Sequence, residues 1–416
     1  MSGEFLPPLV APFLGEHYAD FEALSSLIAP PYDVISPEER QRYLDLHPNS
    51  IVRLTLPKGD DPYHEAAMTL SEWRASGVLQ IDRERCVYVL RQSFVTQSGS
   101  GLARTGLLAA VSVEGYETGR VKPHERTHAH VKEDRLALLR ATRAMFESLL
   151  FLAPDDSARL KTSLSELTAC APLAEANLAG VLSEIWRIEG AAARDLSRAA
   201  QESSIYIADG HHRYETASVY RSENPAADRT LGLIVPLGDP GLTVLPTHRL
   251  VSGGRIDPSA LRKRLEPRFE VVPLDGLTNP VTALESMSPG ATKCVVLLAE
   301  GNFCLRLKHD ADIDDFEESV SPAVAELDVA RIDTLVVAEI CRVAGLGAEV
   351  SYSADVGDVV KSVRNGPHAA GVVLTPTSVE DVLRVADAGA FMPQKATYFS
   401  PKVPSGIVLL PFGEHH

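Results

Sequence analysis

The sequence has little of what several classes of protein need. Its 416 residues include only five cysteines, which are scattered and never form a C-x-x-C pair. This pattern is typical of reduced, mostly buried thiols rather than of a disulfide framework or a zinc ribbon. No apolar run approaches the roughly 18–20 residues of a membrane-spanning helix, and no basic segment followed by an apolar stretch opens the chain. We therefore expect a soluble, cytoplasmic protein with no membrane partner.

Positive charge is also scarce. The chain has 40 lysines and arginines against 56 aspartates and glutamates, a formal net charge of −16. Surfaces that bind nucleic acid need clustered lysines and arginines, so we expect no nucleic-acid partner. A local basic pocket for one small anion is compatible with this charge. The hydrophobic fraction of 45% is ordinary for a globular protein and excludes disorder as the dominant state.

Local patterns predict a mixture of helices and strands, with room for about two to four domains. Ser36, Pro37 and the two glutamates after them are typical of a helix N-terminus. The other expected helices are 63–76, 132–150, the outer segment 155–194 and a stretch ending near 220. The expected strands are 86–94, 103–114, 205–208, 231–237 and 242–245, the first two joined as a hairpin. After Ser252-Gly253-Gly254 short mixed elements follow, which places a boundary near residue 253.

The densest group of polar residues follows an apolar strand. It comprises Asp209, Gly210, His211, His212 and Arg213, at the point where a helix is expected to begin. A helix N-terminus presents unpaired N–H groups and a positive dipole end, both of which favour an anion. The arginine can bind phosphate in bidentate fashion and the imidazoles can donate to further oxygens. Asp209 is a candidate Mg²⁺ ligand; the alternative is a simple Asp-Gly turn with exposed histidines.

A second polar segment, residues 119–135, is rich in histidines and basic residues. One interpretation makes Glu125 a general base, with His124, Lys132 and Arg135 holding an anion. Another uses the letters H-E-x-x-H, since His124 and His128 on a helix would face one zinc ion and form a zinc hydrolase. Pro123 allows a helix to begin here but not to continue from upstream. The third interpretation is a solvated, charged turn.

Three further segments are candidates for substrate binding. Pro30 and Pro31 form a rigid turn that presents Tyr32 and Asp33. His248 and Arg249 end an expected strand and offer an anion contact. The proline-bounded loop from Lys395 to Lys402 contains two lysines and several hydroxyls, which suit a phosphate or carboxylate. In each case an ordinary turn, a surface basic pair or a solvated loop is the alternative.

The two polar segments together resemble the free serine kinases. The resemblance rests on Pro123-His124-Glu125, followed by a helix and then by a strand that runs into Asp209-Gly210-His211-His212-Arg213-Tyr214. Those enzymes share the fold of ParB N-terminal domains and sulfiredoxin. In them the glutamate acts as base on the serine hydroxyl, and the D-G-H-H-R turn holds nucleotide phosphate. The resemblance therefore implies that Glu125 is the base and that Asp209, His211, His212 and Arg213 form the phosphate site.

Nearly the whole chain also resembles a family of bacterial and archaeal proteins catalogued as domain of unknown function number one-thousand-fifteen. The matching stretches are Ala29-Pro-Pro-Tyr-Asp-Val-Ile-Ser36, the Pro-His-Glu segment with residues 132–142, the Asp-Gly-His-His-Arg-Tyr-Glu-Thr-Ala segment, Leu245-Pro-Thr-His-Arg249 and Met392-Pro-Gln-Lys-Ala-Thr-Tyr-Phe-Ser-Pro-Lys402. The family's Asn and Ser-Pro at the end of the expected 132–150 helix are replaced here by Met145, Glu147 and Ser148.

These resemblances imply an α+β protein with a ParB/sulfiredoxin-like catalytic core and α/β additions at both ends. The expected domains are residues 1–118, the core 119–253 with an insertion near 153–200, and 254–416. The implied activity is phosphoryl transfer on free serine or O-phosphoserine in serine metabolism, with ATP or ADP and Mg²⁺, in either direction. The alternative is a nucleotide-binding switch without turnover. The assembly is left open, with a homodimer as one option.

Overall fold

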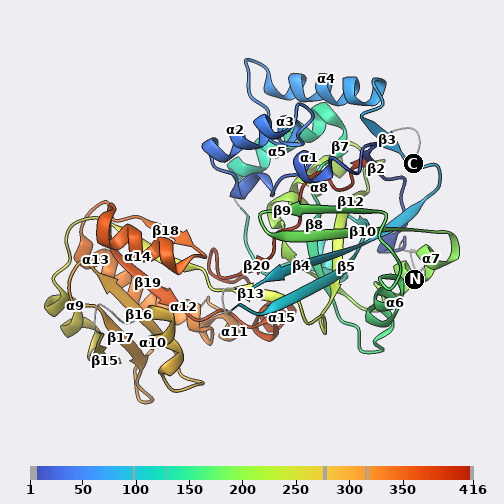
Figure 1. Ribbon diagram of the computed structural model, residues 1–416. Helices are drawn as coiled ribbons and strands as arrows, with labels where there is room; N and C mark the ends of the chain where they lie inside the picture. Colours follow the sequence, from blue (N-terminus) through green and yellow to red (C-terminus); the bar gives the residue numbers. More distant parts are fainter. Residues whose placement is uncertain are drawn as a thin grey trace. The chain divides into compact units, whose positions relative to one another are not determined.

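Figure 1 shows the computed structural model, which describes residues 7–96, 99–127, 129–274, 279–313, 316–317 and 319–412, with the side chains of residues 129–132 excepted. The chain is mixed α+β and divides into two compact units. Unit 1 combines Met1–Thr243 with Pro401–His416, and unit 2 is Val244–Ser400. Of the helices in the described residues, none is long and apolar enough to cross a membrane.

Unit 1 is built on a mixed sheet that contains nine strands within the described residues. Their order is β6-β11-β8-β12-β5-β4-β10-β9, with β1 paired to β5. The bounds are β1 (Val10–Ala11), β4 (Cys86–Val95), β5 (Gly101–Ser112), β6 (Val121–Lys122), β8 (Leu149–Ala153), β9 (Ala174–Leu178), β10 (Val181–Glu189), β11 (Ile205–Asp209) and β12 (Arg229–Pro236). The expected hairpin is present, since β4 and β5 pair antiparallel with Tyr88 opposite Leu108.

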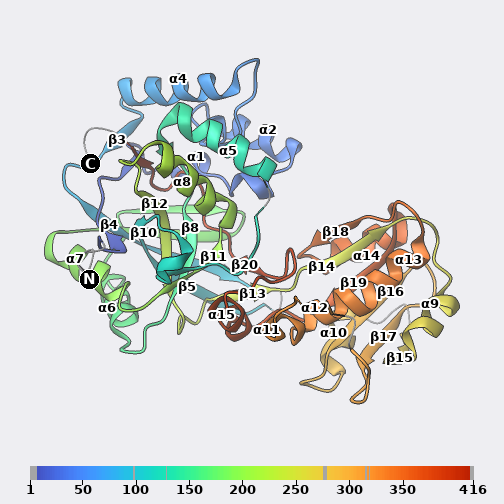
Figure 2. The ribbon, with the colours of Figure 1, turned by 180° about the vertical axis from the view of Figure 1, so that it is seen from behind.

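The helices of unit 1 cover this sheet in two groups. Their bounds are α1 (Leu24–Leu27), η1 (Tyr32–Val34), α2 (Pro37–Leu46), α3 (Val52–Thr55), α4 (Pro62–Ala75), η2 (Tyr116–Thr118), α5 (Ala129–Thr142), α6 (Arg159–Leu167), α7 (Gly190–Ala199) and α8 (His211–Glu223). Helices α6 and α7 bury Leu164 and Leu196 in one core with Val89 and Phe151 of the sheet. Helix α8 packs on β8 and β12, α5 packs on α8, and α4 packs on α5 (Figure 2).

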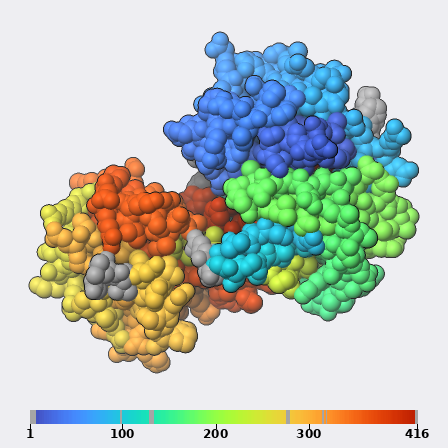
Figure 3. All heavy atoms as spheres, viewed as in Figure 1, coloured from blue at the N-terminus to red at the C-terminus, as the bar shows by residue number. Residues whose placement is uncertain are grey.

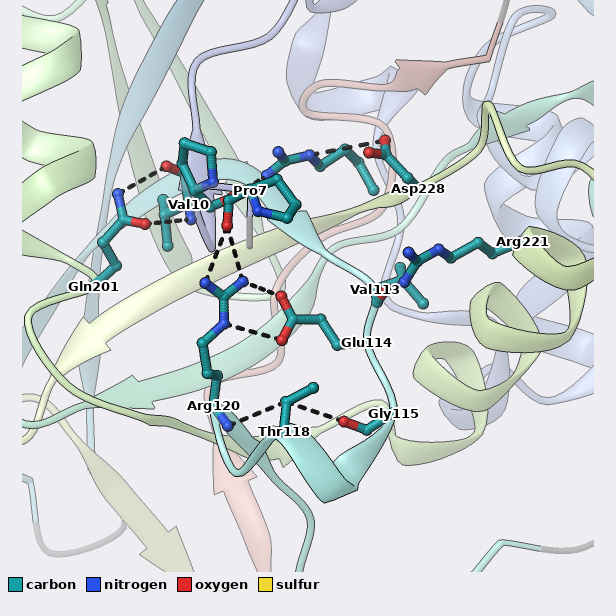
Figure 4. A network of polar contacts seen from close by, with 12 residues as sticks. Pro7, Val10, Val113, Glu114, Gly115, Thr118, Arg120, Gln201, Arg221 and Asp228 are labelled. Carbon is teal, nitrogen blue, oxygen red and sulfur yellow. Dashed lines mark hydrogen bonds and ion pairs between the residues drawn. The ribbon is translucent and has the colours of Figure 1, made fainter. Parts of the chain in front are cut away.

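The N-terminal and C-terminal segments of unit 1 also form two short strand pairs outside the main sheet. The strands involved are β2 (Glu16–Tyr18) with β3 (Leu79–Ile81), and β7 (Ala144–Met145) with β21 (Leu410–Pro411). Figure 4 shows Arg120 donating to the Pro7 carbonyl oxygen and to Glu114. The Gln201 side chain accepts from the backbone N–H of Val10 and donates to its carbonyl oxygen. The Tyr214 hydroxyl bonds to both backbone groups of Glu114, which ties α8 to the same corner. In Figure 3 the blue N-terminal residues lie against green residues of the same unit.

Unit 2 has its own sheet and its own core. Its six-stranded sheet, counted over the described residues, has the order β15-β17-β16-β19-β14-β18. The strands are β14 (His248–Ser252), β15 (Phe269–Pro273), β16 (Lys293–Leu298), β17 (Phe303–Leu307), β18 (Val350–Ser353) and β19 (His368–Leu374), and β13 (Thr243–Leu245) pairs with β20 (Tyr398–Ser400). The helices are α9 (Pro258–Leu265), α10 (Pro280–Ser286), α11 (Pro322–Ala325), α12 (Asp328–Ile332), η3 (Asp333–Val337), α13 (Ala338–Ala344), α14 (Val356–Asn365) and α15 (Val379–Asp387). Val295, Val359 and Val373 meet in the core between sheet and helices.

Two expected helices are wrong in part. The helix expected at 132–150 ends at Thr142, because Arg143 adopts a left-handed φ of 51° and the apolar residues beyond it form β7 and β8. The segment expected to be helical at 155–194 contains the hairpin β9–β10 between α6 and α7. Strand β10 pairs with β4, so this segment extends the main sheet. A short apolar run fits a helix or a buried strand, and only pairing with neighbours decides between them.

The expected domain boundaries also need correction. Strand β5 precedes residue 118 and β12 follows it, yet the two pair along most of their length, with Gly232 opposite Ala109. Residues 1–118 and 119–243 therefore share one sheet and one core. The expected boundary near 253 lies at residue 243, and the chain from Pro401 onward belongs to unit 1 rather than to a separate C-terminal domain.

Candidate active site

The candidate site forms where β11 ends and α8 begins. Gly210 joins the two with a φ of +95°, a conformation that L-residues with side chains rarely adopt. A Cβ atom here would also lie 3.0 Å from Leu149 Cγ and 3.1 Å from Arg213 Cζ, so the position needs glycine for space as well. Among the described residues no side chain caps α8, whose positive N-terminal end begins at His211 in the site.

The parallel pairing of β6 with β11 brings the two polar segments together. Val121 lies opposite Ile205 in this pair. Because the carboxyl ends of parallel strands meet at one edge of a sheet, the residues after β6 and after β11 become neighbours. The backbone N–H of His124 donates to Nε2 of His211 at 3.2 Å, and the two rings meet edge to face with centroids 4.5 Å apart. The two motifs of the sequence therefore form one site.

Both of these histidines are buried. Burial lowers the pKa of His124 to about 4 and lowers the pKa of His211 well below its usual value, so both are neutral at pH 7. A neutral His211 that accepts at Nε2 carries its proton on Nδ1. That nitrogen lies 4.0 Å from Oε2 of Glu125, whose side chain is 22% exposed. The imidazole therefore presents an N–H dipole to the glutamate that the sequence marks as a base.

Asp209 is held between two cations, and we call Asp209, Arg213 and Lys402 the Asp209 cluster. The guanidinium of Arg213 donates to Oδ2 at 2.7 Å, and the ammonium of Lys402 donates to Oδ1. Burial by itself would raise the pKa of Asp209, but Lys402 and Arg213 hold it well below its usual range. Two cations and one carboxylate leave one net positive charge beside the helix N-terminus, which is an environment that suits an anion.

A buried acid lies next to this cluster. The other nitrogen of Arg213, Nη1, donates to the carbonyl oxygen of Ser148 at 2.6 Å. Oε1 of Glu147 accepts from the backbone N–H of Tyr32 at 2.8 Å and from the hydroxyl of Ser405 at 3.0 Å. Burial raises the pKa of Glu147 despite the nearby arginines. A cavity of about 50 Å³ lies between Glu147, Arg213 and neighbouring apolar residues.

The Tyr32 turn is part of the same wall. The guanidinium of Arg135 stacks over the Tyr32 ring with Cζ 4.2 Å from its centroid, and Arg135 also donates to the Thr55 carbonyl oxygen at 2.7 Å. Burial, with the nearby Asp33 carboxylate, raises the pKa of Tyr32 to about 12. Asp33 also contributes to the electrostatic environment of Arg213. Both substrate-binding candidates from the first Pro-Pro turn therefore lie within electrostatic range of the Asp209 cluster.

The geometry contradicts the zinc hydrolase interpretation. That interpretation needs His124 and His128 on successive turns of a helix, but α5 begins only at Ala129. His124 and Glu125 lie in the non-helical segment before it, and His128 lies outside the described residues. Among the described residues, one possible ligand atom each from His124, Glu125 and His211 lies within 4.8 Å of the others, so it is this group, rather than His124 with His128, that could hold a metal ion. Pro123 and His124 thus belong to the connection between β6 and α5.

The surroundings of the Asp209 carboxylate do not suit a bound Mg²⁺ ion. Each carboxylate oxygen of Asp209 is bonded to a cationic side chain, Oδ2 to Arg213 and Oδ1 to Lys402. A divalent cation would have to displace one of these partners and would be repelled by both. These residues do not fit a protein-held Mg²⁺, so the expected metal role of Asp209 is corrected to an ion-pairing role.

Three expected substrate-binding residues lie in unit 2, where each has partners of its own. Arg249 is fully buried and forms a two-bond ion pair with Asp333, with both N···O distances at 2.8 Å. Nδ1 of His248 accepts from the backbone N–H of Leu374 at 3.2 Å. The carbonyl oxygen of Lys395 accepts from Arg249 at 3.3 Å. A role for these residues in substrate binding stays a prediction, and the side chain of Lys132 lies outside the described residues.

Sequence reasoning did not assign Glu147 to the site. It offered the Lys395–Lys402 loop, with both of its lysines, for an anion, but it did not connect Lys402 with Asp209. The chain crosses from unit 2 back to unit 1 at Pro401, and no pattern in the sequence marks that crossing. Glu147 fell inside an expected helix, where an acid indicates nothing about a buried site.

A family model described as "Protein of unknown function (DUF1015)" matches residues 10–330. The chain belongs to this family. The match confirms the membership predicted from the motifs, and it includes Glu125 and the segment from Asp209 to Arg213. Lys402 lies beyond the matched residues. A comparison with curated proteins found no match.

Several solved structures also show likeness to this chain. A conserved hypothetical protein from Pyrococcus furiosus is 14% identical, over 73% of this chain and 94% of that one, with a TM-score of 0.35. A free serine kinase in complex with AMP is 13% identical, over 73% and 92%, with a TM-score of 0.37. SbnI with a C-terminal truncation, from Staphylococcus aureus, is 11% identical, over 72% and 85%, with a TM-score of 0.37. At these TM-scores the likeness carries no argument about this chain, and the ParB/sulfiredoxin-like core stays a prediction.

Proposed function

We propose that this protein is a phosphotransferase that moves a phosphoryl group between the hydroxyl oxygen of free serine and an adenine nucleotide. The observation that carries the proposal is that the β6–β11 pair brings Glu125 to within 4.0 Å of His211, in the turn that also carries Asp209 and Arg213. Phosphoryl transfer needs positioning, charge neutralisation and an orienting base more than covalent help from the protein. One carboxylate beside a buried, net positive cluster supplies those parts.

In the direction of serine phosphorylation, the hydroxyl oxygen attacks the phosphorus while Glu125 accepts the hydroxyl proton. The bond between phosphorus and the leaving oxygen of the nucleotide breaks, and the electron pair stays on that oxygen. Arg213 and the positive N-terminal end of α8 face the charge on the phosphoryl oxygens. In the opposite direction Glu125 returns its proton to the serine oxygen as the phosphoryl group departs to ADP or to water.

The choice of serine and of an adenine nucleotide rests on the resemblance of the Pro-His-Glu and Asp-Gly-His-His-Arg segments to the free serine kinases. The same resemblance supports a ParB/sulfiredoxin-like core within unit 1. The neutral His211, which presents Nδ1–H toward Glu125, is the structural feature that favours a working base over a solvated turn. The same residues serve serine phosphorylation and its reverse, so an assay is needed to distinguish the two directions.

The test is phosphorus NMR of the purified protein in two tubes containing MgCl₂, one with O-phosphoserine and ADP and one with serine and ATP. Loss of phosphoserine with ATP appearing indicates a reversible phosphotransferase, and loss with only inorganic phosphate indicates a phosphatase. Turnover only in the serine tube indicates a kinase. Absence of change in both tubes, with nucleotide binding measured separately by calorimetry, would overturn the proposal in favour of a nucleotide-binding switch.

A further inference from the structure

We propose that Lys402 is the cation that binds the phosphoryl group in this site, and that Asp209 is a positioning residue that aligns Lys402 rather than a metal ligand. This inference rests on the proposed function, because it names the group that holds the phosphate of that reaction. The ligand class is a phosphate monoester or the terminal phosphate of a nucleotide.

The first observation is the placement of the ammonium group. Lys402 contacts Oδ1 of Asp209, and its side chain is only 14% exposed, against 21% for Asp209 and 7% for Arg213. A lysine whose only task was solubility would not bury its charge beside a second buried cation. The two cations on one carboxylate leave a net positive charge to be neutralised by an anion.

The second observation is the fixing of the backbone around Lys402. Nη2 of Arg104 donates to the Pro401 carbonyl oxygen at 2.6 Å, and Nε2 of Gln92 donates to the Lys402 carbonyl oxygen at 3.0 Å. Arg104 is 1% exposed and also bonds to Oε1 of Gln92 at 2.5 Å, so the two side chains form one buried clamp. Two consecutive carbonyl groups are thus held from adjacent strands, β5 and β4. These hydrogen bonds fix the backbone from which the Lys402 side chain extends.

The third observation is that the same chain segment reaches the Tyr32 turn. Ser405 pairs with Ala29 through N–H···O contacts of 2.8 and 3.4 Å, and its hydroxyl donates to Glu147 at 3.0 Å. Glu147 in turn accepts from the backbone of Tyr32. The segment from Pro401 to Ser405 therefore connects the Asp209 cluster with the wall that carries Tyr32. This segment therefore contacts the site twice, at Asp209 through Lys402 and at Glu147 through Ser405.

The chemistry follows from the donor set. Asp209 keeps Lys402 and Arg213 on its two oxygens, which separates the cations at a fixed spacing. A phosphoryl oxygen that approaches the N-terminus of α8 can then accept from the ammonium while another accepts from backbone N–H groups. In this arrangement Lys402 supplies the positive charge that a metal bound to Asp209 would otherwise supply. Both carboxylate oxygens of Asp209 already accept from a cation, and these two cations would repel such a metal.

The test is calorimetric binding of inorganic phosphate, O-phosphoserine and ADP to the full chain, with serine and adenosine as ligands that lack phosphate. We expect Lys402→Met to weaken the three phosphate ligands at least about tenfold and to leave adenosine unchanged, since a charge-assisted contact is lost. Lys402→Arg should restore part of the affinity. Lys58→Met, at an exposed lysine of unit 1, is the matched control and should bind as the wild type does.

Repeating the inorganic phosphate titration in EDTA separates Lys402 from a metal. We expect equal phosphate affinity with and without EDTA. A requirement for Mg²⁺ would overturn the inference. Lys402→Met protein that binds phosphate like the wild type would also overturn it. Wild-type protein that binds no phosphate ligand would overturn it too. If phosphate binds through Lys402 but NMR shows no transfer, the proposed function fails while the phosphate site stands. If transfer occurs with Lys402→Met unchanged, the inference alone fails.

Discussion

At the scale of single residues, the surroundings of each group in the site decide whether it is neutral or charged. Burial holds His124 and His211 neutral, while Asp209 stays ionised because Lys402 and Arg213 are bonded to it. A histidine with Nδ1–H beside Glu125 can orient that carboxylate without neutralising it. In the proposed reaction these groups have two tasks: a carboxylate takes a proton, and cations hold a phosphoryl group.

Replacement of Glu125 by glutamine removes the proton acceptor but keeps the shape of the side chain. We expect turnover in the NMR assay to fall about 10²- to 10⁴-fold, which is the usual contribution of a positioned general base. Nucleotide affinity, measured by calorimetry, should stay within about twofold of the wild type, because the Asp209 cluster is untouched. Turnover within a few-fold of the wild type would show that another group accepts the proton.

The buried histidines predict a pH dependence of stability. The pKa of His124 is about 4 in the folded state, below the ordinary histidine value of 6.5, so between these values the unfolded state binds more protons. The stabilisation is therefore complete above about pH 6.5 and is lost as the pH falls toward 4. By linkage, His124 alone costs about 2 kcal/mol of unfolding free energy on going from pH 7.5 to pH 5.

Urea unfolding at pH 7.5 and pH 5 measures this loss. The matched variant His124→Gln cannot take up the proton, so its unfolding free energy should change by about 2 kcal/mol less between the two pH values. His211 contributes in the same direction in both proteins, since its pKa is lowered as well. An equal loss in variant and wild type would mean that His124 is already accessible to protons in the folded state.

At the scale of elements, helix boundaries follow local chemistry where caps are present. Ser36 accepts from the backbone N–H of Glu39 at 3.2 Å, and Glu39 accepts from the backbone N–H of Ser36 at 2.9 Å. This reciprocal pair is a capping box, and it starts α2 at Pro37 as the sequence predicts. Where such a signal is missing, as between Thr142 and Leu149, the pairing of strands decides the structure.

Removal of the cap is a direct check. We expect Ser36→Ala to lower the unfolding free energy of unit 1 by about 1 kcal/mol, because one helix N–H loses its acceptor. Gln41→Ala, at an exposed position within the same helix, should change it by less than about 0.5 kcal/mol. Both values come from urea unfolding at pH 7.5. A cost at Ser36 no larger than that at Gln41 would show that tertiary contacts, rather than the cap, hold the start of α2.

At the scale of the whole molecule, the chain leaves unit 1 at residue 243, forms unit 2 and returns at Pro401. Each unit has its own sheet and core, which is the usual condition for separate unfolding. The candidate site described above, from Glu125 to Lys402, is built from residues of unit 1 alone. A ligand of that site therefore stabilises one unit directly.

Differential scanning calorimetry should show two transitions that can be assigned by core variants. Leu196→Ala in α7 and Val373→Ala in β19 each remove a buried side chain, so each should lower the transition of its own unit. O-phosphoserine or ADP at a hundredfold excess over its Kd should stabilise the Leu196-sensitive transition by about 2.7 kcal/mol. A ligand shift confined to the Val373-sensitive transition would place the phosphate site in unit 2.

The sequence by itself determined the motifs that make up the candidate site and where several elements begin. The Asp-Gly-His-His-Arg turn, the Pro-His-Glu segment and the cap at Ser36 are local patterns, and local sterics and hydrogen bonding are enough to read them. Family membership was likewise predicted from such motifs and is confirmed by the match over residues 10–330.

Only the tertiary structure decided how these residues meet. The parallel pairing of β6 with β11 joins the two motifs, and Lys402 reaches Asp209 across a sequence separation of 193 residues. The pairing of β5 with β12 merged two expected domains into one. Strand partners and chain returns are set by the burial of a shared core, which is a property of distant residues together, so no local pattern in the sequence records them.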